Sequence, residues 1–259
     1  MGNNSKKLTE HYVAYIDILG AKNFINSDNN SGDYLNKLAT VYNNVINKIN
    51  NNYKVVYNTD IKFKIFSDNI IIAIEKNSKN DETINYSKTE LLISIVSLFQ
   101  IEALLQSMLS RGGIVIEKLC IDELFVYGKA LTKAYTLESE LAIYPRVIIS
   151  NDDVIEFQSS NCNCRHIHKD KANIHYINPF EVYFEIFYEL KKTELEKIRN
   201  ILIEKMNINN NDKIKQKVCW LLNEFNEFCK TNEKVKDYSI IIDYFPHNET
   251  YLNKKRGQK

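Results

Sequence analysis

Short runs of β-branched and aromatic residues alternate with longer amphipathic stretches along the first part of the chain. The short runs, which are typical of strands, lie at residues 13–18, 62–66, 70–74, 112–120, 124–127 and 146–150. Apolar residues recur at helical spacing over residues 33–49, 87–109 and 128–142. This order of strands and helices predicts an α/β sandwich whose sheet contains antiparallel hairpins.

The last part of the chain has a different pattern. Long helical repeats of apolar residues cover residues 180–206 and 210–230, with Asn- and Lys-rich segments between them. We therefore expect two units, an α/β domain at residues 8–177 and a helical extension at residues 178–245 that packs on it.

Two aspartates lie at the edges of otherwise apolar strands. Asp17 ends the first strand, and Asp68 lies in the predicted tight turn between the strands at 62–66 and 70–74. A carboxylate in such a place is costly to desolvate unless a partner compensates it, and a divalent cation is a strong partner for a carboxylate. The pair therefore suggests a shared metal site. An N-cap role for Asp17 at the start of a following helix is the alternative.

Composition narrows the classes of function. The chain has 259 residues, 44% of them hydrophobic, so it can bury a sizeable core. Its formal net charge of +1 gives no broad positive field, and we expect no nucleic-acid partner. The five cysteines are irregularly spaced, no apolar signal segment begins the chain, and no apolar stretch is long enough to span a bilayer. A soluble cytoplasmic protein without a membrane partner is expected.

Further side chains are candidates for binding phosphate. Residues Leu19, Gly20, Ala21 and Lys22 form a turn into a helix, where backbone N–H groups and the lysine favour an anion. Arg111, just before Gly112, is placed to bind a phosphate or to stabilise a transition state. The alternatives are a surface role for Lys22 and a helix-end role for Arg111. Glu138, Ser139 and Glu140 are expected on the solvated face of a helix.

A second group of possible metal ligands is Cys162, Cys164, His166 and His168. Four such side chains could form a tetrahedral zinc site. Structural zinc sites more often take their ligands from two separate segments, and this spacing matches no known signature. An ordinary variable loop is the favoured interpretation.

Four segments, in order, resemble the motifs of class III nucleotidyl cyclases. They are residues 15–24 around Asp17, residues 67–73 around Asp68, residues 111–114, and residues 126–138. The resemblance implies an antiparallel-rich sheet with helices. It also implies two Mn²⁺ or Mg²⁺ ions held by Asp17 and Asp68, with the Ile18 carbonyl as a further ligand. The reaction implied is the closure of a ribonucleoside triphosphate to a cyclic monophosphate with release of pyrophosphate.

Within that family, the short span from Arg111 to Gly128 and the helical tail around Lys217 and Trp220 look most like the bacterial Pycsar pyrimidine cyclases. This likeness implies UTP or CTP as substrate and cyclic UMP or cyclic CMP as an anti-phage messenger. It also implies a homodimer with composite active sites and an effector protein activated by the product.

The sequence departs from the family pattern at several positions. The transition-state asparagine and arginine of the family fall on Thr132 and Thr136, so Arg111 or Lys133 has to replace the arginine if the chemistry is conventional. In the base pocket the purine-reading lysine falls on Lys64, on the same strand face as Phe66, and the purine-reading aspartate falls on Phe125. The alternatives are a purine or cyclic-oligonucleotide synthase, and a catalytically degenerate dimer that binds nucleotide as a sensor or scaffold.

Overall fold

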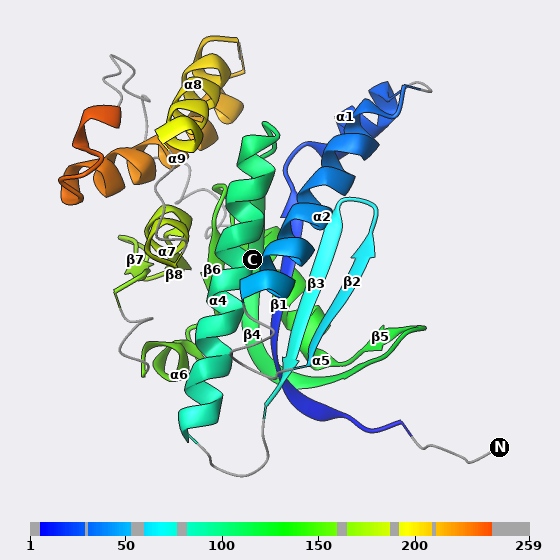
Figure 1. Cartoon of the computed structure of the whole chain (residues 1–259). Helices are drawn as coiled ribbons and strands as arrows, with labels where there is room; N and C mark the ends of the chain where they lie inside the picture. Colours follow the sequence, from blue (N-terminus) through cyan, green and yellow to red (C-terminus); the bar gives the residue numbers. More distant parts are fainter. Residues whose placement is uncertain are drawn as a thin grey trace, which may run out of the picture.

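The computed structural model describes residues 6–28, 31–52, 60–76, 82–159, 165–186, 192–208 and 211–239. Its first half contains the strands β1 (Thr9–Ile18), β2 (Ile61–Phe66), β3 (Asn69–Glu75) and β4 (Ser110–Ile121). Helices α1 (Ala21–Ser27) and α2 (Asp33–Asn52) follow β1, and α4 (Glu82–Leu105) joins β3 to β4 (Figure 1). These elements form a β-α-β-β-α-β arrangement in which β1 lies between β3 and β4.

Within the described residues the sheet has eight strands and is mostly antiparallel. Its order is β2-β3-β1-β4-β6-β8-β7, with β5 (Val126–Tyr127) paired to β4 alone. The other strands are β6 (Val147–Ile149), β7 (Ile167–Lys169) and β8 (His175–Ile177). Of the pairings in the described residues, only that of β4 with β6 is parallel. The long central strands β1 and β4 take part in most of the strand pairing.

Each face of the sheet is covered by different helices. Side chains alternate along β1, so that Tyr12, Ala14 and Ile16 join the large core beneath α2 and α4. Val13 and Tyr15 point to the other face, where they pack with Ala130 and Ala134 of α5 (Lys129–Thr136). Asp17 shares the parity of Tyr15 and so belongs to the α5 face.

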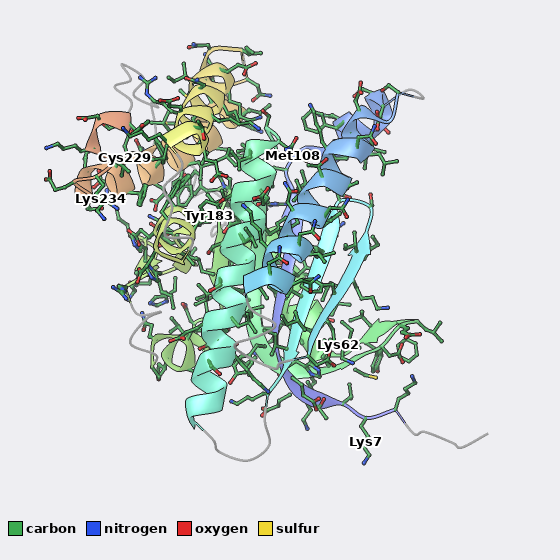
Figure 2. All side chains as sticks on the ribbon, viewed as in Figure 1. Lys7, Lys62, Met108, Tyr183, Cys229 and Lys234 are labelled. Atoms are coloured by element: carbon green, nitrogen blue, oxygen red, sulfur yellow. The ribbon has the colours of Figure 1, made fainter. Side chains whose placement is uncertain are left out.

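The remaining helices extend the core on the α4 side. They are α6 (Val154–Gln158), α7 (Pro179–Ile186), α8 (Lys192–Ile208) and α9 (Asp212–Thr231), followed by the short 3-10 helix η2 (Lys236–Tyr238). Tyr183 and other side chains of α7 pack beside α4 (Figure 2). The amide oxygen of Asn211 caps α9 by accepting from the Lys213 N–H at 3.0 Å. Apolar residues of α8 and α9 join the same core as the sheet.

The predicted fold class, an antiparallel-rich α/β sheet with helices and a helical C-terminal part, is confirmed. The helix predicted at 87–109 ends four residues earlier, because Ser107 adopts a positive φ of 61° and turns the chain into β4. No clear strand was predicted in the α/β domain after residues 146–150, whereas β7 and β8 follow them. Each has three residues, too few to show a period of two.

The single helix predicted at 180–206 is divided into α7 and α8, and residues 187–191 between them lie outside the described residues. No helix in the described part of the chain combines the length and apolar character that crossing a membrane requires.

Candidate functional site

The two predicted metal aspartates lie together at one end of the central strands. Asp17 is opposite Asn69 of β3 and Arg111 of β4, so that three polar side chains sit in one row across the sheet. Asp68 follows Ser67, whose φ of 56° makes the tight β2–β3 turn. The backbone carbonyl of Asp68 accepts from the Ile18 N–H at 3.3 Å. This backbone bond fixes the turn against the end of β1. Asp68 is close enough to Asp17 for its negative charge to raise the pKa of Asp17.

Arg111 brings a positive charge close to Asp17. Its Nε lies 3.6 Å from Oδ2 of Asp17, and its Nη2 lies 2.6 Å from Oε1 of Glu138. Its Nη1 donates to the carbonyl of Ala142 at 3.3 Å. One guanidinium therefore joins β1, β4 and the segment that follows α5.

Glu138 corrects a prediction made from the sequence. It was expected on a solvated helix face, but its side chain is only 3% exposed. The helix changes to a π-helix, η1 (Leu137–Leu141), directly after α5, and this change turns Glu138 inward. Its charge pattern, Glu-Ser-Glu, gave no sign of this, because a π-turn has no simple sequence signature.

Gly113 allows the end of α5 to come close to β4. A Cβ on Gly113 would lie 2.5 Å from the carbonyl oxygen of Ala134 and 2.6 Å from Cβ of Leu137. Both distances are shorter than real carbon contacts allow, so only glycine fits here. The close approach brings Glu138, the next residue after Leu137, to Arg111.

The electrostatics of the site favour added positive charge. Burial raises the pKa of Asp17 to about 7, with further increases from Glu138 and Asp68, while Arg111 opposes the shift. Burial also raises the pKa of Glu138, and Arg111 again opposes the shift. Asp17 and Glu138 thus share the guanidinium of Arg111, and Asp68 adds a further negative charge near Asp17.

This donor set fits a hard divalent cation. Such ions prefer carboxylate and carbonyl oxygens. Asp17 and Asp68 offer carboxylates, and the Ile18 carbonyl, in the residue next to Asp17, is the further ligand expected from the sequence resemblance. A cation would also replace the proton on Asp17 and relieve the surplus of negative charge. Across the described ranges, no group of three or more His, Cys, Asp and Glu side chains is arranged to hold a metal, so water or substrate oxygens would complete the coordination.

The predicted phosphate-binding turn lies directly after the site. Gly20 has a φ of 82° and precedes α1, with no side-chain cap on the helix. Ala21 is buried, Leu19 is partly buried against the core, and Lys22 is exposed. The Leu19 N–H donates to the Leu109 carbonyl at 2.7 Å, which ties the turn to the chain just before β4.

The residues predicted on α5 do not reach Asp17 within one copy of the chain. Thr132, Lys133 and Thr136 are all exposed. The Nζ of Lys133 lies 3.7 Å from Oδ2 of Asp152, which is in the turn just before α6. The structure therefore brings Arg111 to the two aspartates and leaves these three side chains facing outward.

The predicted base-reading residues are on β2 and on the segment between β4 and β5. Lys64 of β2 donates through Nζ to the carbonyl of Glu123, in the arm that joins β4 to β5. Phe125 in the same arm is 43% exposed, and the Nζ of Lys6 lies 5.3 Å from its ring centroid. Phe66, at the end of β2, is 50% exposed. Of these three residues, Lys64 is thus the one whose contact joins β2 to the arm.

The possible zinc ligands are only partly described, because Cys162 and Cys164 lie outside the described residues. His166 Nε2 lies 2.8 Å from Oε2 of Glu185, and His168 Nε2 lies 2.9 Å from Oε2 of Glu181. Both imidazoles therefore already have carboxylate partners on α7.

Comparison with known proteins gives likeness of fold alone. No protein-family model and no curated protein sequence matches the chain. A class III adenylyl cyclase-like ATP-binding protein from Pseudomonas aeruginosa aligns over 72% of this chain and 43% of its own, with a TM-score of 0.47 and 9% identity. A bacterial light-regulated adenylyl cyclase aligns over 71% of this chain and 58% of its own, with a TM-score of 0.39 and 12% identity. The chain thus spans less than two thirds of either protein.

Proposed function

We propose that this chain is a metal-dependent nucleotidyl cyclase. The observation that carries the proposal is the meeting of Asp17 and Asp68 at the end of β1, where burial and the surrounding carboxylates raise the pKa of Asp17 to about 7. A site with this surplus of oxygen ligands and negative charge favours Mg²⁺ or Mn²⁺, the ions that accompany nucleoside triphosphates.

Each group in the site has a part in this proposal. Asp17, Asp68 and the Ile18 carbonyl would hold two ions, which when bound supply Lewis acidity toward the sugar hydroxyl and the phosphates. Arg111 and the turn from Leu19 to Lys22 bind phosphate oxygens. In the reaction the ribose 3′-oxygen forms a bond to the α-phosphorus, the bond from that phosphorus to the bridging oxygen breaks, and pyrophosphate leaves. The hydroxyl proton passes to solvent.

The proposed substrate is a pyrimidine triphosphate, UTP or CTP. Phe125 stands where an aspartate would help to read a purine, and the ammonium of Lys64 is engaged with the Glu123 carbonyl. An apolar ring and a lysine whose ammonium already has a partner offer a purine edge fewer hydrogen-bond partners. The proposed role, from the sequence resemblance, is the production of cyclic UMP or cyclic CMP as an anti-phage messenger for an effector protein.

We also propose that the active unit is a homodimer. The exposed side chains Thr132, Lys133 and Thr136 of α5 do not face Asp17 in their own chain. A second copy could receive them, and the exposed Tyr135 between them, 52% accessible, adds apolar area for such a contact.

A second candidate function is nucleotide binding without turnover, as a sensor or scaffold. The Arg111–Glu138 ion pair favours it, because a buried carboxylate 2.6 Å away neutralises the cation close to Asp17. Such an arrangement retains a binding site but withholds charge from a transition state.

The test is to incubate the purified chain with each of the four ribonucleoside triphosphates and Mn²⁺, and to identify the products by mass spectrometry. Asp68→Asn is the site variant, and Asp60→Asn, whose side chain is 79% exposed, is the matched control. Cyclic UMP or cyclic CMP from the wild type and from Asp60→Asn, but not from Asp68→Asn, would support the proposal. Purine products would refute the pyrimidine assignment, and triphosphate binding without any product would favour the sensor.

A further inference from the structure

One stripe of helix α9 runs from the small strands of the sheet toward Arg111. Lys217, Trp220, Leu221 and Glu224 recur at spacings of three and four residues and so share one face of the helix. Three of these residues make contacts that fix how the helix lies. The fourth, Lys217, is half-buried, and its position follows from the placement of the other three.

The C-terminal part of the stripe is anchored to β8 and to the loop before β6. Glu224 Oε1 accepts from the Tyr176 hydroxyl at 3.1 Å. The Trp220 ring stacks on Tyr144, with centroids 5.5 Å apart and an interplanar angle of 14°. The Arg146 guanidinium carbon lies 5.5 Å from the Trp220 ring centroid.

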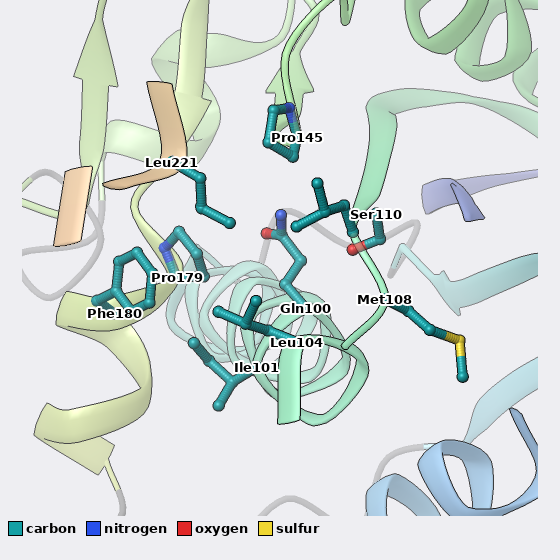
Figure 3. Close-up of a pocket in the computed structure, with 10 residues that line it drawn as sticks. Gln100, Ile101, Leu104, Met108, Ser110, Pro145, Pro179, Phe180 and Leu221 are labelled. Carbon is teal, nitrogen blue, oxygen red and sulfur yellow. The ribbon is translucent and has the colours of Figure 1, made fainter. Parts of the chain in front are cut away.

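The next contact leads to the start of β4. Leu221 lines a small pocket together with Pro145 and Ser110, and Figure 3 shows these side chains gathered around Gln100 of α4. Ser110 is the residue before Arg111, and the Gly112 N–H donates to the Arg146 carbonyl at 3.1 Å. Helix α9 therefore lies over the strand ends from which Arg111 projects.

Lys217 is one turn before Trp220 and Leu221, on the face of α9 that these two residues share. Trp220 packs on the buried apolar group of Ala142, Ile148 and Tyr176, as does Leu137; Leu137 begins the π-helix that carries Glu138, and Ala142 follows its last residue. Burial lowers the pKa of Lys217, the positive charge of Arg111 lowers it further, and the negative charge of Asp17 opposes both. The effects of Arg111 and Asp17 on the pKa of Lys217 agree with the position that the packing of α9 gives to this lysine.

Two cations from different elements thus approach the site together. Within the described residues, the Lys217 ammonium makes no ion pair of 4.0 Å or less, whereas Arg111 already pairs with Asp17 and Glu138. A half-buried ammonium that feels the charge of a guanidinium is stabilised by an anion bound between the two groups.

We infer that Lys217 is a phosphate-binding residue, through which the helical C-terminal extension contributes to the site on the sheet. The inference rests on the proposed function and names the part of the substrate that this lysine contacts, the polyphosphate. It also gives the extension a role besides stability. Loss of the extension or displacement of α9 would remove a positive charge from the site.

The test measures binding of Mg²⁺-tripolyphosphate, a probe without base or sugar, by titration calorimetry on the full chain. Lys217→Met is the test variant and Lys217→Arg the conservative one. Lys230→Met is the matched control, because Lys230 lies on the same helix with its side chain 63% exposed. We expect about tenfold weaker binding in Lys217→Met, recovery to within about threefold in Lys217→Arg, and no change in Lys230→Met.

A parallel titration with Mn²⁺ alone separates phosphate binding from a structural role. Removing a positive charge near Asp17 should leave Mn²⁺ affinity unchanged or raise it, so a loss confined to tripolyphosphate supports the inference. Equal loss for both probes, or wild-type affinity for tripolyphosphate in Lys217→Met, would overturn it while leaving the cyclase proposal intact. A wild-type protein that binds neither tripolyphosphate nor any nucleoside triphosphate would refute both.

Discussion

The Nη2 atom of Arg111 lies 2.6 Å from Oε1 of Glu138, and this ion pair joins the start of β4 to the π-helix after α5. Glu138 is almost fully buried, whereas Arg111 retains 23% exposure and also reaches Asp17. The arginine is thus shared between a buried carboxylate and the proposed metal site. Any ligand that draws Arg111 toward phosphate has to compete with Glu138.

Replacing Glu138 with glutamine is expected to change the pH at which the site binds metal. Glu138 is the strongest charged neighbour that raises the pKa of Asp17, after burial. Without its charge, Asp17 ionises at lower pH, and the midpoint of Mn²⁺ binding should move down by about half a unit or more. Calorimetric Mn²⁺ titrations between about pH 6 and pH 8 measure this midpoint.

The control for this prediction is Glu140→Gln. Glu140 is exposed on the same π-helix, so this variant removes the same charge at a solvent-exposed position. An unchanged midpoint in Glu138→Gln would show that Glu138 does not act on Asp17.

Asp17 is also expected to make stability depend on pH. Its pKa is about 7 in the folded chain against an ordinary value of 3.8. Between these values the folded state keeps a proton that the unfolded state has lost, so the free energy of unfolding falls as the pH rises through this range and is level above it. In metal-free buffer, Asp17→Asn should therefore raise the free energy of unfolding by ~1–3 kcal/mol at about pH 8, and change it little at about pH 4.

Urea unfolding with a chelator present, at several pH values, provides the measurement. The exposed-site variant Asp60→Asn should keep the pH dependence of the wild type. If Asp17→Asn instead lowered the free energy of unfolding at high pH, the fold would stabilise the charged Asp17 carboxylate, and the prediction would be wrong.

Gly113→Ala tests the close packing of α5 on β4. The added Cβ meets the Ala134 carbonyl and Leu137, so the end of α5 has to move away. We expect a loss of ~1–3 kcal/mol in the free energy of unfolding and a weaker hold of Glu138 on Arg111. The exposed Ser139→Ala on the π-helix serves as control and should change stability by less than about 0.5 kcal/mol. Wild-type stability in Gly113→Ala would mean that α5 can shift at no cost.

The sequence was sufficient to place the aspartate pair. A carboxylate at the end of an apolar strand and another in a hairpin turn are local features, and the strand order then brings them together. Arg111 was also recognisable, because it directly precedes a glycine pair that opens a strand. These features depend on periods of two and on turn residues, which a single sequence displays.

Glu138 and the contacts of α9 were not accessible in the same way. The inward turn of Glu138 depends on a π-helix and on the absence of a side chain at Gly113, which lies far from it in sequence. The position of Lys217 depends on how Trp220 stacks on Tyr144, a contact between separate elements. Such tertiary contacts leave no periodic signal within either segment.

The last prediction concerns the anchoring of α9. Trp220→Leu removes the stack on Tyr144 and the contact with Arg146, and should lower the free energy of unfolding by ~1–3 kcal/mol. Because the stack also sets the position of Lys217, tripolyphosphate affinity should fall although the lysine is retained. Tyr127→Leu, an aromatic replacement at a site 67% exposed, should affect neither quantity. If Trp220→Leu loses stability but keeps full affinity for tripolyphosphate, another contact holds Lys217 in place, and the helix stripe is not what presents it to the site.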